Sequence, residues 1–92
     1  MLDYTGWIVR SEAGHDSGKR FCVVGVEGER LLLADGKTRK LAAPKRKQLG
    51  HVTILSKGLF AHPVIQKMHS GQTVSDREIR RMLAAFRDEM EV

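Results

Sequence analysis

Cationic side chains are the residues of this 92-residue sequence best placed to do chemistry, and one stretch concentrates them. Positions 37–47 carry six cations and no acidic residue: Lys37, Arg39, Lys40, Lys45, Arg46 and Lys47. Clustered Lys and Arg bind polyanions because they release the counterions condensed around phosphates. Pro44 stiffens the stretch and lowers the entropy that docking would cost. The stretch therefore predicts a phosphate-binding surface, with a plain solvated charged face as the alternative.

A second group of polar residues surrounds a glycine-bearing stretch nearer the N-terminus. Residues 11–18 read S-E-A-G-H-D-S-G, and both glycines suit a backbone with positive φ. Four side chains flank this stretch and should lie near one another once the neighbouring strands pair: Arg10, His15, Lys19 and Arg20. They predict further phosphate contacts, again against the alternative of plain surface.

Catalytic and metal-binding constellations are not indicated. The four histidines have no ligand-like spacing and no companion pair of cysteines. The sequence has no GxxxxGK[ST] phosphate loop and no arguable Ser–His–acid set, and Asp16 and Asp35 are better explained as turn formers. Cys22, in the apolar run 21–26, is expected to be a small buried side chain. We therefore expect no enzyme activity, no metal site and no cofactor.

The distribution of charge favours a nucleic-acid partner. The formal net charge is +5 and the pI is near 9.8. Residues 1–58 hold 11 Lys/Arg against 6 Asp/Glu, whereas residues 59–92 hold five of each, so the excess belongs to the N-terminal two-thirds. The sequence has a single cysteine, no long apolar run and no signal-peptide pattern. These features predict a cytoplasmic protein without a membrane partner.

Five short strands are expected to position the basic stretches. They cover residues 6–10, 21–26, 30–34, 38–41 and 51–55, separated by turn signals such as Asp35-Gly36. A spacing of about ten residues does not suit a parallel sheet, whose strands need crossover helices. It favours a mainly β fold, a small antiparallel barrel whose closure removes exposed edges.

The C-terminal third is expected to end in a helix from about residue 76 to 90. Ser75-Asp76-Arg77-Glu78 forms a capping box, with Val74 and Ile79 as a hydrophobic staple. Apolar residues at three- and four-residue intervals mark one face: Ile79, Met82, Leu83, Phe86 and Met90.

The expected organisation is a single domain with three segments. Residues 1–56 form the barrel, 57–74 a connector, and 75–92 the helix packed on the barrel. The connector is predicted to place four apolar side chains on the barrel: Leu59, Phe60, Val64 and Ile65.

Residues 6–26 resemble the KOW motif. They read G-W-I-V-R-S-E-A-G-H-D-S-G-K-R-F-C-V-V-G-V, with Gly14 in the place of the characteristic glycine and Gly18-Lys19 behind it. Together with residues 34–41 and 44–47, the likeness covers about residues 6–56. It is to the KOW-containing large-subunit ribosomal proteins fourteen, six and twenty-seven of archaea and eukaryotes, and most of all to their small bacterial relatives. The resemblance implies an SH3-like barrel that contacts structured RNA through its loops, generally on the ribosome.

The leading hypothesis is a non-catalytic RNA-binding protein that contacts ribosomal or ribosome-associated RNA, with the large ribosomal subunit as a candidate partner. Recognition would be by shape and backbone, because the chain has few aromatic residues. Trp7 fits either base stacking or the core. The alternative is an SH3-like protein-interaction adaptor that uses the face of Ile79, Leu83 and Phe86 or a barrel groove. A DNA-binding protein shares the charge logic, but the expected helix is near-neutral.

Overall fold

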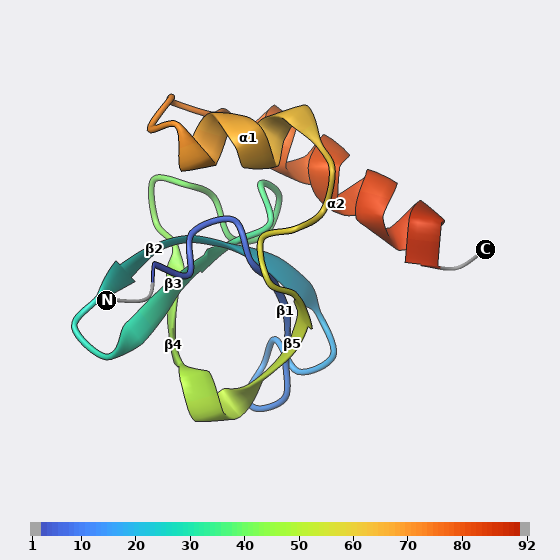
Figure 1. Ribbon diagram of the computed structural model, residues 1–92. Helices are drawn as coiled ribbons and strands as arrows, with labels where there is room; N and C mark the ends of the chain where they lie inside the picture. Colours follow the sequence, from blue (N-terminus) through green and yellow to red (C-terminus); the bar gives the residue numbers. More distant parts are fainter. Residues whose placement is uncertain (1–2, 91–92) are drawn as a thin grey trace.

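The computed structural model describes residues 3–90, so residues 1–2 and 91–92 of the expected barrel and helix segments lie outside the described residues. The strands are β1 (Ile8–Ser11), β2 (Arg20–Glu27), β3 (Arg30–Ala34), β4 (Lys45–Gln48) and β5 (Val52–Ser56). The 3-10 helix η1 (Leu49–His51) joins β4 to β5, and the α-helices α1 (Pro63–His69) and α2 (Asp76–Met90) follow (Figure 1).

The strands form one antiparallel sheet in the order β4-β3-β2-β1-β5. Val9 lies opposite Phe21, and Val23 lies opposite Leu33. Figure 1 shows the sheet strongly curled, with η1 bridging its two outer strands. The ladders within residues 3–90 do not pair β4 with β5, so the sheet is open. The expected mainly β fold is therefore confirmed as a five-stranded antiparallel sheet with a C-terminal helix.

The concave face of the sheet carries its own apolar core. Its members alternate along β1, β2 and β3, as the two-residue period of a strand requires: Val9, Phe21, Val23, Leu31 and Leu33, each at most 2% exposed. Tyr4, Trp7 and Val52 pack against this cluster. Of the two interpretations of Trp7, the structure gives the half-buried core position, with its ring edge-on to Tyr4 at 4.7 Å.

The opposite face is covered by the two helices. Ile8 and Cys22, the neighbours of the concave-face residues, join Ile65 of α1 and Ile79 of α2 in a second buried cluster. Val24, two residues after Cys22 in β2, lies on the same face and packs against this cluster as well. The two faces together explain why the strands read as nearly continuous apolar runs.

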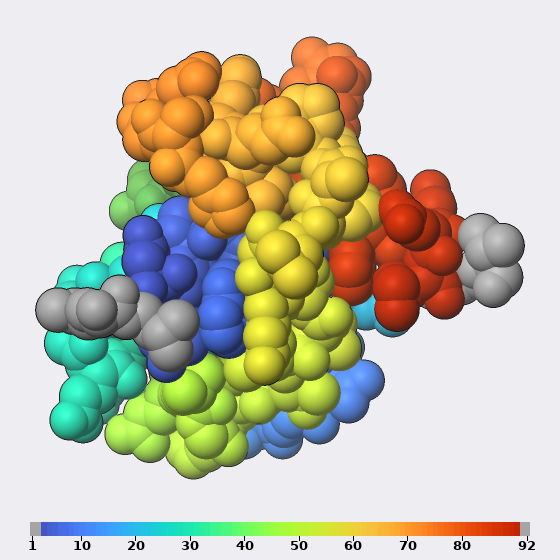
Figure 2. All heavy atoms as spheres, in the orientation of Figure 1, coloured from blue at the N-terminus to red at the C-terminus, as the bar shows by residue number. Residues whose placement is uncertain are grey.

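The helix α2 begins and packs as its sequence indicates. The backbone N–H of Ser75 donates to Glu78 Oε1 at 3.0 Å, and the N–H of Glu78 donates to Ser75 Oγ at 3.2 Å, which confirms the capping box. Met82 and Phe86 are buried, whereas Met90 is 61% exposed because the last turns of α2 protrude from the molecule (Figure 2).

One expected strand is absent from the described structure. Residues 38–41 form a turn rather than a strand. The Asp35 carboxylate accepts hydrogen bonds from the backbone N–H groups of Lys37 (2.9 Å) and Arg39 (2.8 Å) and from the Thr38 hydroxyl (2.6 Å). These bonds require the chain to fold back on itself, so residues 38–41 cannot extend as a strand. The fourth strand forms later, at β4.

The connector contains a helix that the sequence did not indicate. Pro63 occupies the first turn of α1, where its missing N–H costs nothing, and the His62 side chain caps the helix by accepting from the Val64 N–H. Val64 and Ile65 are buried, and Phe60 packs against the same cluster, as expected. Leu59 is 86% exposed, so its predicted packing is wrong.

Candidate nucleic-acid interface

The loop between β1 and β2 is held by its own backbone. The Ser11 N–H donates to the Lys19 carbonyl at 2.9 Å, and the Gly18 N–H donates to the Ser11 carbonyl at 2.7 Å. Gly14 and Gly18 have φ of 80° and 86°, so the expected positive φ at Gly14 is confirmed. The loop is therefore a defined turn with both glycines at positions that disfavour other residues.

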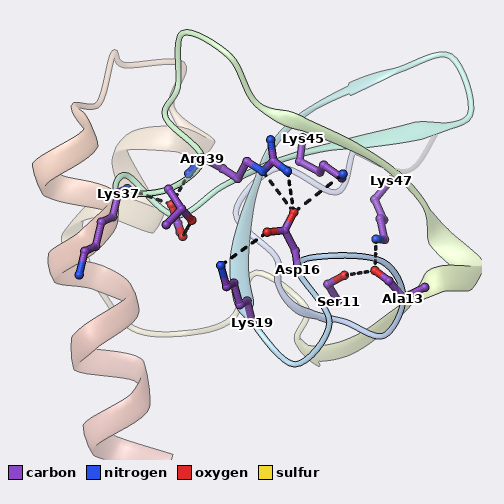
Figure 3. Close-up of polar contacts among 10 residues, drawn as sticks. Ser11, Ala13, Asp16, Lys19, Lys37, Arg39, Lys45 and Lys47 are labelled. Atoms are coloured by element: carbon purple, nitrogen blue, oxygen red, sulfur yellow. Dashed lines mark hydrogen bonds and ion pairs between the residues drawn. The ribbon is translucent and has the colours of Figure 1, made fainter.

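Asp16 in this loop is the centre of a cluster of cations. Its carboxylate accepts from Arg39 Nη2 at 2.9 Å and Nε at 3.2 Å. Lys19 Nζ lies 3.7 Å from one of its oxygens and Lys45 Nζ 3.9 Å from the other. Figure 3 shows the three cations converging on Asp16 from the loop, the β3–β4 segment and β4.

The Asp16 carboxylate stays ionised in spite of its burial. Its side chain is 6% exposed, and burial by itself would raise its pKa. The hydrogen bonds and charge of Arg39, with the charges of Lys19 and Lys45, outweigh burial and lower the pKa. The three cations carry more charge than one carboxylate can neutralise and remain 30–49% exposed, so this cluster presents net positive charge to solvent.

The strand β4 divides its cations between the two sides of the sheet. Arg46 points outward and pairs with Glu27 at 2.8 Å. Lys47 points inward and is only 8% exposed, and its ammonium group donates to the Ala13 carbonyl of the first loop (Figure 3). Lys47 was expected to meet phosphates, but the structure gives it the role of fastening the loop to β4.

A shallow depression of about 370 Å³ continues the Asp16 cluster across β4. It is lined by Arg30, Lys45, Arg46, Lys47, Gln48 and His51. Lys45 both contacts Asp16 and lines this depression, so the two areas are continuous. We call the combined surface the basic face, made of Lys19, Arg30, Arg39, Lys45, Arg46 and His51.

The expected binding residues do not all share this face. Lys37 lies toward α2 and away from Asp16 (Figure 3). Lys37 and Arg20 both line a groove beside α2. Arg10 pairs with exposed Glu12 at 2.8 Å. His15 and Lys40 are exposed. The six cations of residues 37–47 are therefore distributed over at least two sides of the chain rather than aligned on one.

Two residues of the basic face were missed by the sequence reasoning. Arg30 begins β3 and lies opposite Gln48 of β4, and His51 ends η1. Their placement depends on the pairing of β3 with β4, which required locating β4. A strand composed of K-R-K-Q gives no apolar signal for this purpose.

The remaining polar and ionisable groups were compared with the geometry that a metal or a reactive thiol requires. Among residues 3–90, no three His, Cys, Asp or Glu side chains are grouped so that they could hold a metal ion. Cys22 is fully buried, and burial raises the pKa of its thiol to about 12. Neither helix in the same range combines the length and the apolar character needed to cross a membrane.

Comparison with models of known protein families gives no match, and comparison with curated protein sequences gives none either. The functional assignment therefore depends on the geometry of the basic face and on the KOW-like pattern of residues 6–26.

Proposed function

We propose that this chain is a non-catalytic, cytoplasmic RNA-binding protein with an SH3-like KOW barrel. Its basic face contacts the backbone of structured RNA, ribosomal or ribosome-associated, with the large ribosomal subunit as the candidate partner. The observation that carries the proposal is the convergence of Lys19, Arg39 and Lys45 on the buried carboxylate of Asp16.

Preorganisation supports this use of the basic face. The Asp16 carboxylate fixes three long cationic side chains that would otherwise lose conformational entropy on meeting phosphates. The loop carrying Asp16 and the strand carrying Lys45 are distant in sequence, and the buried Lys47 ammonium joins them. A cationic surface with fixed spacing suits recognition of an A-form backbone and its 2′-hydroxyls better than base reading.

The adaptor alternative loses one of its two candidate surfaces. Ile79 is fully buried and Phe86 is 5% exposed, because both pack in the core between α2 and the sheet. Ile79 and Phe86 are therefore occupied by the core of the chain itself, and of the three residues of that face only Leu83 is partly exposed.

The proposal is tested by neutralising exposed cations of the basic face. Lys19, Arg30 and Arg46 are replaced by Gln, and binding to a hairpin RNA with a stem of about 16 base pairs is measured by fluorescence anisotropy over a range of salt concentrations. Each neutralisation should flatten the plot of log K against log salt by roughly 1. Lys57→Gln and Arg77→Gln, at exposed positions outside the basic face, are the matched controls.

Two results would count against the proposal. One is a triple variant with the affinity and salt slope of the wild type. The other is equal binding of a DNA hairpin of the same sequence, which would remove the preference for A-form geometry. Sucrose-gradient fractionation of cell extracts then tests the ribosomal partner, because the wild type should travel with the large subunit and the triple variant should not.

A further inference from the structure

A groove of about 310 Å³ lies between α2, the start of β2 and the turn after β3. It is lined by Arg20, Asp35, Lys37, Arg80, Leu83, Ala84 and Arg87. None of these residues belongs to the basic face. Figure 3 shows Lys37 extending along α2, while its neighbour Arg39 reaches in the other direction to Asp16.

The groove is strongly positive. It contains four cations and one carboxylate, and the Asp35 carboxylate is already occupied by the hydrogen bonds of its own turn. Within residues 3–90, Arg20, Lys37 and Arg80 have no carboxylate partner within 4.0 Å. Among the same residues, Arg87 pairs with Asp88 of its own helix, at 3.3 Å. The cations of the groove are therefore largely available to an anionic ligand.

The walls of the groove are fixed relative to each other. Arg80 Nη1 donates to the Gly36 carbonyl at 3.2 Å, and the Leu41 N–H donates to Asp76 Oδ1 at 2.8 Å. Gly36 approaches α2 so closely that a Cβ there would lie 2.1 Å from the Asp76 carbonyl oxygen. A ligand would enter a formed site rather than pay for assembling one.

The floor of the groove is apolar. Leu83 and Ala84 are partly exposed and lie between Arg80 and Arg87 on α2, which are two helical turns, or about 10 Å, apart along the axis. The ligand that fits has at least two anionic groups and a flat or apolar body between them. Its volume must match a pocket at the small end of the range for small-molecule sites, which begins at about 300 Å³.

We propose that this groove binds one unpaired nucleotide of the RNA, with its flanking phosphates on Arg20, Lys37, Arg80 and Arg87 and its base or ribose on Leu83 and Ala84. The inference rests on the proposed function and deepens it: the basic face holds the helical part of the RNA, and the groove reads an adjoining single-stranded nucleotide. The two sites are connected through the chain, because Arg20 directly follows Lys19 and Lys37 lies two residues before Arg39.

The test compares two RNA probes on the full chain. The first is the hairpin described above, and the second is the same hairpin with a short single-stranded 3′ extension. The wild type should bind the extended probe more tightly, by about tenfold, because the extension adds phosphates that the four cations of the groove can neutralise. The double variant Lys37→Gln/Arg87→Gln should lose most of this preference, and Ala84→Glu, which places a carboxylate on the floor, should abolish it.

The control removes the same number of charges, both of them from α2. Arg77→Gln/Arg81→Gln removes two exposed cations that do not line the groove, and it should retain the preference for the extended probe. Equal preference in all variants, or equal loss in the control, would overturn the groove as a nucleotide site while leaving binding of the plain hairpin intact. Failure of the wild type to bind either probe would instead reject the proposed function.

One further arm separates a nucleotide from an acidic protein segment. A Glu-rich peptide is titrated against the same variants. If the peptide binds the wild type, loses affinity in Lys37→Gln/Arg87→Gln, and the RNA preference is unchanged in that variant, the groove is a protein-docking site and the nucleotide assignment is wrong.

Discussion

Asp16 shares its two carboxylate oxygens among Arg39, Lys19 and Lys45, with its side chain 6% exposed. Its sequence context, between glycines in a polar stretch, predicted a turn former, and its carbonyl does accept the Lys19 N–H at 3.0 Å. The ionic role was not predictable, because it depends mainly on Arg39 and Lys45, which lie more than twenty residues further along the chain. Only the folded sheet brings them together.

Replacement of Asp16 by Asn should therefore destabilise the protein. The variant leaves Arg39 with a weaker acceptor and three cations without their counter-charge, which should cost about 2 kcal/mol of unfolding free energy. Urea denaturation measures the difference. Asp88→Asn is the control, because the pair of Asp88 with Arg87 is exposed and the substitution should change stability by less than about 0.5 kcal/mol. Similar values for the two variants would show that the Asp16 cluster contributes no more than an ordinary surface pair.

Lys47 shows that a basic residue in a cationic stretch need not be exposed to solvent in the folded chain. A run of basic residues indicates where positive charge is placed along the chain, but in a strand alternate side chains point to opposite faces. Arg46 therefore points to solvent and Lys47 points to the interior, and amino-acid composition cannot reveal this difference. For the other candidate residues, the phosphate contacts remain predictions.

Among the helices and strands, the sequence predicted those elements whose determining residues lie close together along the chain. The capping box and the apolar spacing of α2 predicted its start and the buried positions of Ile79, Met82 and Phe86, but not the exposure of Met90. The strand β4 was missed because K-R-K-Q becomes a strand only by pairing with β3. The helix α1 was missed because Pro63 suggests a break until its place in the first turn, after the capping His62, is known.

The contact between the turn at Gly36 and the start of α2 should be sensitive to a single methyl group. Gly36 has φ of 77°, and its Cβ would lie 2.1 Å from the Asp76 carbonyl oxygen and 2.9 Å from Arg80 Cγ. Gly36→Ala should therefore cost about 3 kcal/mol, from left-handed strain together with overpacking. Gly28→Ala has a similar φ of 61° but open space around the new methyl, and it should cost only about 1 kcal/mol.

Thermal denaturation of both variants measures this difference. A secondary readout is the preference for the single-stranded extension, which Gly36→Ala should reduce because it displaces one wall of the groove. Equal melting temperatures for the two glycine variants would mean that α2 can shift away from the turn without cost.

For the whole molecule, stability should decrease in acid. Burial acts to raise the pKa of Asp16 and Asp35, but hydrogen bonds to Arg39 and to Thr38 respectively give a net lowering. In Glu78 the hydrogen bond from Lys67, followed by that from the Ser75 N–H, lowers the pKa. A carboxyl whose pKa is lower in the folded state contributes stability above its unfolded pKa and loses it as pH falls through the folded value.

The unfolding free energy should thus hardly respond to these carboxyls between pH 7 and pH 5, and should fall below about pH 4.5. Urea denaturation at a series of pH values tests this, with Asp16→Asn as the comparison, because it should lose less stability over the acid range. A variant curve parallel to that of the wild type would show that Asp16 has the same pKa in both states.

The labelling rate of the Cys22 thiol can report how often the helices move away from the sheet. It is fully buried between the sheet and α1, its Sγ lies 3.8 Å from Met68 Sδ, and its pKa of about 12 leaves almost no thiolate. A disulfide reagent can then react only during brief openings, so the labelling rate gives the frequency of those openings. Met68→Ala should accelerate labelling, whereas Met90→Ala, at an exposed position, should not. If RNA occupies the groove beside α2, its addition should slow the reaction, and ligand binding could be followed without labelling either the RNA or a surface residue.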